Sequence, residues 1–401
     1  MNMKSKITIP ILFIMVAAGL WITQLRPSTP SFPDVNQELQ YLISDLVKND
    51  TSVKNCALSV IKGDDSVVWS GGAGIASQDG QVPMTQDTPF YIASITKLYT
   101  ATAVMRLYEQ GSLSLDDPMS KYLPAELIQG IHVYEGRDYS HDITLHHLLS
   151  HTSGIADYYT EKPKGGKSLF EVFLEEPERK WTAEETIEIV RNDLQPNFPP
   201  GTDASYSDTN FQLLGKVIEA ITDKPLHVVF EEFFFCPLKL KHTGLVGHFN
   251  AGSIRFAAPA DVFCRDRNIT AIRSNGSYWA DGGIVSTAGD CILFLKALNE
   301  GRMIRKDTLT LMHNWHKLKF PLQYGYGTMY FKLPRFMKMV MNVPELWGHS
   351  GSTGSFLYYA EDLDLYMAGS INQTESKLTP FKLMGRVAKT IQKGFDKGGK
   401  N

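Results

Sequence analysis

Apolar and polar positions alternate in a helical pattern at residues 91–111, YIASITKLYTATAVMRLYEQG. Its apolar side chains recur at steps of three and four residues, which predicts a helix with one buried face. Gly111 is a helix-stopping residue at the expected C-terminal end. Ser94 lies at the start of this helix, and Lys97 follows three residues later on the same face.

The same patterns predict elements on both sides of this helix. An amphipathic helix is predicted from Val35 to Leu46, and the β-branched runs 56–62 and 66–70 indicate a hairpin. The chain from about 103 to 301 is mostly helical in pattern, and its sequence Thr-Ala-Glu-Glu at 182–185 is typical of a capping box. Strands are then predicted at 324–331, 339–347, 355–360 and 365–371, followed by a helix at 379–393.

Strands at both ends of a helical middle predict an α+β fold, with an antiparallel sheet flanked by helices and an inserted, mostly helical domain. We therefore expect a sheet domain built from residues 33–95 and 320–401, and a helical domain at 96–319. At 401 residues the chain is long enough to bury a large core.

The first 30 residues differ in character from the rest. Lys4 and Lys6 precede an apolar run at 7–22, which is typical of an export signal. The run is short for a membrane-spanning helix, and no clean small-x-small cleavage site follows it. The segment is therefore either a cleaved signal or a retained membrane anchor, and both place the rest of the chain outside the cytoplasm.

Composition excludes several classes of function. The chain is 43% hydrophobic and 21% charged with a net charge of −3, so it has no basic surface suited to nucleic acid. It contains no dinucleotide-binding or Walker motif. Its four cysteines, which form no Cys-x-x-Cys pair, are interpreted as buried free thiols: Cys56, Cys236, Cys264 and Cys291.

The spacing of Ser94 and Lys97 has a chemical interpretation. A serine in the first turn of a helix has an unpaired backbone N–H and lies at the positive end of the helix dipole, and an amine three residues later can share its proton. These are properties of a nucleophile. On its own the pair fits equally well an N-cap serine followed by a surface lysine.

Two further segments resemble parts of a site more than parts of a core. Tyr206 lies among turn-forming polar residues in PPGTDASYSDTN, residues 199–210. The second segment is GHSGSTG at 348–354, where the density of glycine allows another backbone or a substrate to approach closely. The structural alternatives are a half-buried loop tyrosine and a simple hairpin turn.

Together, Ser94-Ile95-Thr96-Lys97, Tyr206-Ser207-Asp208 and His349-Ser350-Gly351 resemble the three motifs of the penicillin-recognising serine hydrolases, with class C β-lactamases, DD-peptidases and esterases among them. Connecting segments are similar too: GSLSLDDPMSKYLP (111–124), ITLHHLLSHTSGI (143–155) and GGIVSTAGD (282–290). The resemblance runs from about residue 35 to the C-terminus and implies a β-lactamase/transpeptidase-like fold.

The resemblance implies a role for each motif residue. Ser94 would attack a carbonyl carbon to form an acyl-enzyme, and Lys97 would either lower the pKa of Tyr206 or accept the serine proton itself. Tyr206 would act as the base and later protonate the leaving group. The backbone N–H groups of Ser94 and Ser352 would form the oxyanion hole. Substrate binding is implied for Asp208 and for the residues of the third motif: His349, Ser350, Gly351 and Ser352.

Asp208 departs from the class C pattern, which has asparagine at this position. An ionised carboxylate only accepts hydrogen bonds, whereas an amide also donates. We expect Asp208 to pair with Lys97 or with a substrate ammonium or hydroxyl, and to weaken hydrolysis of β-lactams without affecting acyl transfer as such.

The sequence therefore predicts an exported serine hydrolase that acts through an acyl-serine on an ester or a D-amino-acid peptide. A true β-lactamase and a non-catalytic peptidoglycan- or penicillin-binding protein are the alternatives. The expected partner is a small-molecule or peptidoglycan-like substrate, with no nucleic acid. No cofactor is expected, and His146, His147 and His151 lack the carboxylate or cysteine that would complete a metal site.

Overall fold

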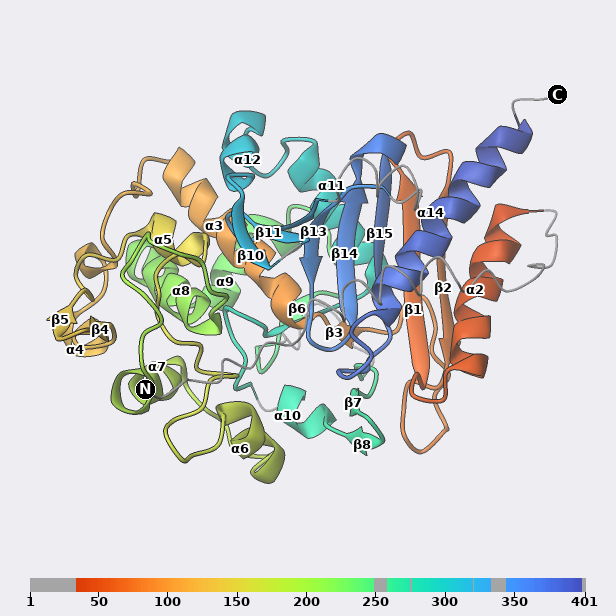
Figure 1. Ribbon diagram of the computed structural model, residues 1–401. Helices are drawn as coiled ribbons and strands as arrows, with labels where there is room; N and C mark the ends of the chain where they lie inside the picture. Colours follow the sequence, from red (N-terminus) through yellow and green to blue (C-terminus); the bar gives the residue numbers. More distant parts are fainter. Residues whose placement is uncertain (1–33, 249–257, 275, 320, 333–343, 399–401) are drawn as a thin grey trace, which may run out of the picture.

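The structure is a computed structural model that describes residues 34–248, 258–274, 276–319, 321–332 and 344–398 (Figure 1). The predicted export segment lies outside these residues. Within them, no helix has both the length and the apolar character needed to cross a membrane.

An antiparallel sheet of eight strands forms the frame of the molecule, in the order β10-β11-β12-β13-β14-β15-β1-β2. The first strands of the chain, β1 and β2, pair as the predicted hairpin and complete the sheet beside β15. The strands are β1 (Asn55–Lys62), β2 (Val68–Gly74), β10 (His316–Lys319), β11 (Leu322–Tyr324), β12 (Met329–Phe331), β13 (Leu346–Ser350), β14 (Ser355–Ala360) and β15 (Leu365–Ser370).

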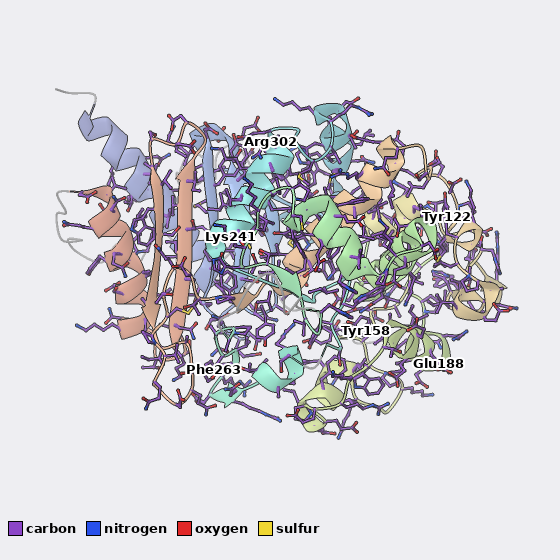
Figure 2. The ribbon with its side chains drawn as sticks, turned by 180° about the vertical axis from the view of Figure 1, so that it is seen from behind. Tyr122, Tyr158, Glu188, Lys241, Phe263 and Arg302 are labelled. Atoms are coloured by element: carbon purple, nitrogen blue, oxygen red, sulfur yellow. The ribbon has the colours of Figure 1, made fainter. Side chains whose placement is uncertain are left out.

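Helices cover both faces of this sheet. The terminal helices α2 (Val35–Asn49) and α14 (Thr379–Gly398) pack together on one face (Figure 1), where their apolar sides and the strands form a small core. The helix α11 (Ala288–Asn299) lies across β15, β1 and β14 on the other face, seen from behind in Figure 2. Several side chains between these layers are fully buried, as expected for a sheet covered on both sides.

The mostly helical part lies beside the sheet and is built around α3 (Thr96–Glu109), most of whose residues are buried. It contains α4 (Ala125–Ile128), α5 (Leu145–Leu149), α6 (Leu169–Glu175), α7 (Ala183–Asp193), α8 (Asp208–Thr222), α9 (Leu226–Phe230) and α10 (Thr270–Ser274). The predicted capping box is confirmed at α7, where Thr182 and Glu185 bond each other's backbone N–H groups.

A small three-stranded sheet connects this part to the nucleophile segment. It pairs β3 (Phe90–Tyr91) and β6 (Gly244–Leu245) with β9 (Ile284–Ser286). These strands are only two or three residues long, which is too short for an alternation of apolar and polar residues to predict them.

The predicted α+β arrangement is confirmed, with differences in detail. The run 324–331 is not one strand: it contains the last residue of β11, a turn at Gly327, whose φ is +64°, and β12, which pairs antiparallel with β11. The predicted domain boundary at 319/320 does not match the packing, since β10 belongs to the sheet and α11 covers it. The predicted strand at 339–347 lies partly outside the described residues, and β13 begins at Leu346.

All four cysteines are free thiols, as expected. Cys56 and Cys291 are buried, and burial raises the pKa of both thiols to about 12, so they behave as small apolar side chains. Cys236 is exposed and Cys264 is half-buried, so the expectation of burial is wrong for these two.

Candidate active site

Ser94 lies in a single 3-10 turn, Ala93–Ile95, that leads directly into α3. Ala93 has a φ of +49°, an unfavourable value for a residue with a side chain. The turn is held from the sheet side, because the hydroxyls of Thr353 and Ser355 donate to the Tyr91 and Ile92 carbonyls at 2.7 and 2.8 Å. A strained conformation kept in place by tertiary hydrogen bonds is typical of a functional residue.

The Lys97 ammonium is buried and is surrounded by oxygen atoms. Its Nζ donates to Ser94 Oγ at 3.3 Å and to the backbone carbonyl of Asp281 at 2.7 Å. It also forms a close ion pair with the Asp208 carboxylate. The expected pairing of Asp208 with Lys97 is thus present, and it joins the first and second motifs directly.

The carboxylates decide the charge of this lysine. Burial by itself would lower the pKa of Lys97, but the Asp208 and Asp281 carboxylates outweigh it and raise the pKa above its ordinary value. Lys97 is therefore an ammonium in this arrangement, so it donates to Ser94 and has no free lone pair with which to accept a proton.

Tyr206 lies in the loop that leads into α8, on the Lys97 side of Ser94. Lys97 Nζ is 5.2 Å from the centre of its ring, and the buried Tyr206 hydroxyl has no hydrogen-bond partner of good geometry among the described residues. Burial and the Asp208 charge raise the pKa of Tyr206 well above its ordinary value, while the nearby Ser94 hydroxyl lowers it. With its pKa raised in this way Tyr206 is a neutral phenol, and only its phenolate form, stabilised by the Lys97 charge, could accept the Ser94 proton.

His151 contacts the loop that contains Tyr206 and holds it in place. Its ring lies 4.3 Å from the ring of Tyr206, and its Nδ1 accepts from the Ser207 backbone N–H at 3.2 Å. Burial and the Lys97 charge keep the pKa of His151 well below its ordinary value, so the ring is neutral. The segment at 143–155 thus supports the loop of the second motif.

The third motif lies at the end of β13, but its histidine turns away from the cavity. The buried His349 ring has both nitrogens occupied, with Nε2 3.0 Å from the Tyr324 hydroxyl and Nδ1 2.7 Å from the Ser350 carbonyl. Burial lowers the pKa of His349 to about 3, so it is neutral. Its substrate-binding role stays a prediction, and the geometry gives it a structural contact with Tyr324 instead.

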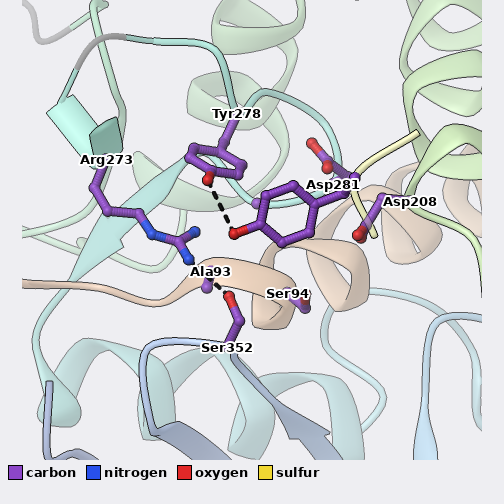
Figure 3. A pocket seen from close by; sticks show the side chains of 9 residues that line it. Ala93, Ser94, Asp208, Arg273, Tyr278, Asp281 and Ser352 are labelled. Atoms are coloured by element: carbon purple, nitrogen blue, oxygen red, sulfur yellow. Dashed lines mark hydrogen bonds between the residues drawn. The ribbon is translucent and has the colours of Figure 1, made fainter. Parts of the chain in front are cut away.

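Ser350, Gly351 and Ser352 differ in what they face. The Ser350 hydroxyl bonds the Tyr358 hydroxyl at 2.8 Å. A side chain at Gly351 would come within 2.3 Å of the Ile92 carbonyl, so glycine is required where the third motif packs against the nucleophile turn. Ser352 faces the cavity and accepts a hydrogen bond from Arg273 at 2.9 Å (Figure 3).

A small cavity opens beside Ser94 (Figure 3). Of the predicted site residues, Ser94, Asp208 and Ser352 line it, whereas Lys97 and Tyr206 are not among its lining residues. The remaining lining residues are Ala93, Tyr159, Arg273, Tyr278, Asp281 and Gly282.

Several of these residues were not predicted from the sequence. Asp281 directly precedes the segment GGIVSTAGD, and only that neighbourhood could have pointed to it. Its carboxylate accepts from the Tyr158 hydroxyl at 2.6 Å and from Gln212 at 2.9 Å. Beneath Asp208, the buried Asp157 accepts the Asp208 backbone N–H at 2.9 Å, and burial together with the Asp208 charge raises the pKa of Asp157 to about 7.

The histidines weighed as metal ligands have other contacts. His146 Nδ1 lies 2.6 Å from the Tyr326 hydroxyl, and His147 takes part in the cap of α5. Within the described parts of the chain, no cluster of three or more histidine, cysteine or acidic side chains is arranged to hold a metal ion.

The geometry is that of a serine nucleophile beside a buried cation, and comparison with known proteins agrees with it. The Beta-lactamase family model matches residues 43–386. The chain belongs to the Beta-lactamase family and is a serine hydrolase of that family. This also confirms the β-lactamase/transpeptidase-like fold.

Relatives of the chain include hydrolases of more than one kind. It is 29% identical to esterase EstB of Burkholderia gladioli over 51% of this chain and 49% of the relative. It is 27% identical to the D-alanyl-D-alanine-carboxypeptidase/endopeptidase AmpH of Escherichia coli over 71% of this chain and 68% of the relative. The matched segments thus span about half of the first relative and two thirds of the second.

Solved structures match over nearly the whole chain. A D-stereospecific amidohydrolase from Streptomyces sp. is 28% identical with a TM-score of 0.67, over 88% of this chain and 98% of that one. The D-amino acid amidase from Ochrobactrum anthropi SV3, complexed with D-phenylalanine, is 24% identical with a TM-score of 0.71, over 90% of this chain and 99% of that one. The second likeness shows the fold alone.

Proposed function

We propose that this hydrolase cleaves small esters or D-amino-acid peptides through an acyl-Ser94 intermediate. The observation that carries the proposal is the contact of Ser94 Oγ with Lys97 Nζ at 3.3 Å, beside a cavity that Ser94 itself lines. An esterase and a D-alanyl-D-alanine carboxypeptidase among the relatives support this choice of substrates.

In the proposed reaction Tyr206 first loses its own proton to solvent. Ser94 Oγ then attacks the substrate carbonyl carbon, and its proton passes to the Tyr206 phenolate oxygen. Because Lys97 is an ammonium, its charge stabilises the phenolate that receives this proton, and Lys97 does not act as the base itself. Tyr206 then protonates the leaving group, and water releases the acyl group by the reverse sequence. The backbone N–H groups of Ser94 and Ser352 would stabilise the oxyanion.

Hydrolysis of β-lactams ranks below these reactions. Asp208 lines the cavity and forms an ion pair with Lys97. Its carboxylate oxygens are hydrogen-bond acceptors, whereas an acylamide carbonyl at this position would need a donor. This arrangement favours substrates without a carbonyl at that position.

We also propose that the protein acts outside the cytoplasm, delivered by its N-terminal segment. The basis is the sequence pattern of Lys4 and Lys6 before the apolar run 7–22. Cell fractionation with protease treatment of intact cells tests this. Protection of the chain from external protease, together with recovery in the cytosolic fraction, contradicts it.

The test of the catalytic proposal compares the wild type with Ser94→Ala. Mass spectrometry after exposure to a fluorescent penicillin and to a panel of small esters should show an acyl adduct on the peptide that contains Ser94, and none in the variant. Turnover should fall by several orders of magnitude, since loss of a serine nucleophile elsewhere costs about 10⁶-fold. Ester cleavage by Ser94→Ala at the wild-type rate contradicts the proposal.

A further inference from the structure

A buried cation without an ionic partner lines the cavity beside Ser94. Arg273 is 3% exposed, and its guanidinium points toward Ser352 (Figure 3). Nη2 donates to Ser352 Oγ at 2.9 Å, and buried Nε has no hydrogen-bond partner. In the described part of the chain no acidic side chain forms a salt bridge with it. A buried charge in this condition is costly unless something else pairs with it.

The nearby carboxylates are committed to other groups. Asp208 pairs with Lys97. Asp281 accepts hydrogen bonds from Tyr158 and Gln212 through its two oxygens. The negative charges of the cavity are therefore held on one side, around Lys97, and the Arg273 charge on the other side is left for a ligand.

Aromatic side chains fix the direction of the guanidinium. Its central carbon lies 4.3 Å from the centre of the Tyr278 ring, and the Tyr278 hydroxyl donates to the Tyr159 hydroxyl at 3.1 Å. Stacking on a ring holds the planar group in place while its Nε–H has no partner among the described residues. A rigid guanidinium fork matches the two oxygens of a carboxylate.

The position of Arg273 relative to the proton donor indicates which part of the substrate it meets. Under the proposed function the leaving group departs toward Tyr206, whose ring centre lies 5.2 Å from Lys97 Nζ. The cavity lined by Arg273 does not include Tyr206, so it receives the acyl part. We propose that Arg273 binds a carboxylate on the acyl part of the substrate and makes the enzyme selective for such acyl groups. This inference rests on the proposed function.

The experiment uses two esters with the same leaving group and five-carbon acyl chains, 4-nitrophenyl hydrogen glutarate and 4-nitrophenyl valerate. The ratio of their kcat/KM values should favour the glutarate in the wild type. In Arg273→Gln this ratio should fall about 10- to 100-fold, the effect typical of losing a charged hydrogen-bond partner. Arg273→Lys keeps the charge but lacks the fork, so its ratio should lie between the two.

Arg302→Gln is the matched control, since it removes one positive charge from an exposed position that does not line the cavity (Figure 2). Its ratio should equal that of the wild type. Equal loss of the two esterase activities in Arg273→Gln overturns the proposal, because a purely structural role would lower both activities. A wild type that cleaves both esters without preference for the glutarate also overturns it.

A binding measurement separates this proposal from the catalytic one. In Ser94→Ala, which cannot turn over, monomethyl glutarate should raise the melting temperature more than methyl valerate does. Adding Arg273→Gln should abolish the difference. Such a difference supports the Arg273 site even if the wild type cleaves neither ester, whereas no difference overturns it even if Ser94 is acylated.

Discussion

The ion pair between Lys97 and Asp208 makes Asp208→Asn the most informative substitution. It keeps the shape of the side chain and removes one buried charge next to the nucleophile. Two effects follow, one on stability and one on substrate preference, and they can be measured separately.

The stability effect follows from the burial of the pair. The Lys97 side chain is 0% exposed and that of Asp208 is 9% exposed, so removing one partner leaves a buried ammonium without its counter-ion. Breaking such a pair costs about 3–5 kcal/mol, and we expect about 3 kcal/mol because the asparagine oxygen still accepts from Lys97. Urea unfolding measures this value. The pKa of Lys97 should also fall, since the Asp208 charge helps to raise it.

The effect on specificity follows from hydrogen-bond chemistry at the cavity wall. A substrate amide carbonyl that faces Asp208 meets only acceptors, and an unpaired buried carbonyl costs about 1–3 kcal/mol. At 1.36 kcal/mol for each factor of ten, Asp208→Asn should raise the kcat/KM of a chromogenic cephalosporin about 10- to 100-fold relative to a nitrophenyl ester.

The control for this experiment is Asp203→Asn, which removes the same charge from an exposed position five residues earlier. Its ratio of cephalosporin to ester activity should not change. A wild type that already prefers the cephalosporin, or a ratio unaffected by Asp208→Asn, would refute the reasoning.

Three further predictions follow from the site. Tyr206→Phe should lower ester turnover about 10²- to 10⁴-fold with little loss of stability, because it removes the proposed base; stopped-flow acylation rates at the wild-type level contradict this. Asp157 has a pKa of about 7 when folded and 3.8 in the unfolded chain, so the folded form holds the extra proton and its stabilising contribution is lost as the pH rises. The unfolding free energy of the wild type should therefore fall by up to about 3 kcal/mol between pH 5 and 7 relative to Asp157→Asn, and parallel pH curves for the two proteins speak against it. Gly351→Ala should lose about 1–3 kcal/mol of stability, because its methyl group would meet the Ile92 carbonyl at 2.3 Å; an unchanged urea midpoint shows that the turn can move aside.

Local patterns in the sequence were sufficient for elements whose stability is local or whose apolar period is clear. The buried helix α3 and the capped helix α7 begin close to where their residues indicated. The strand β14 matches the predicted range, because a continuous run of buried side chains marks a strand covered on both faces. The place of Ser94 at a helix start is also a local property, but its role as the candidate nucleophile came from the resemblance of three separate motifs to a known family.

Other features depend on contacts between residues far apart in the chain, and periodicity does not carry that information. The two strands β11 and β12 read as one apolar run until a turn at Gly327 separates them. The third-motif histidine could be recognised, but its direction is decided by Tyr324, 25 residues earlier.

The charge distribution around the nucleophile was the least accessible to sequence reasoning. The sequence suggested that Asp208 could pair with Lys97, but not that Asp281 would also hold this lysine through its carbonyl. Nothing local to Arg273 marks it as part of the site, because its importance arises only where α10 brings it beside Ser352. The sequence determined which chemical groups were present and the helices that carry them. The tertiary packing decided which charges were paired, since pairing in a buried site depends on distances that only the folded chain sets.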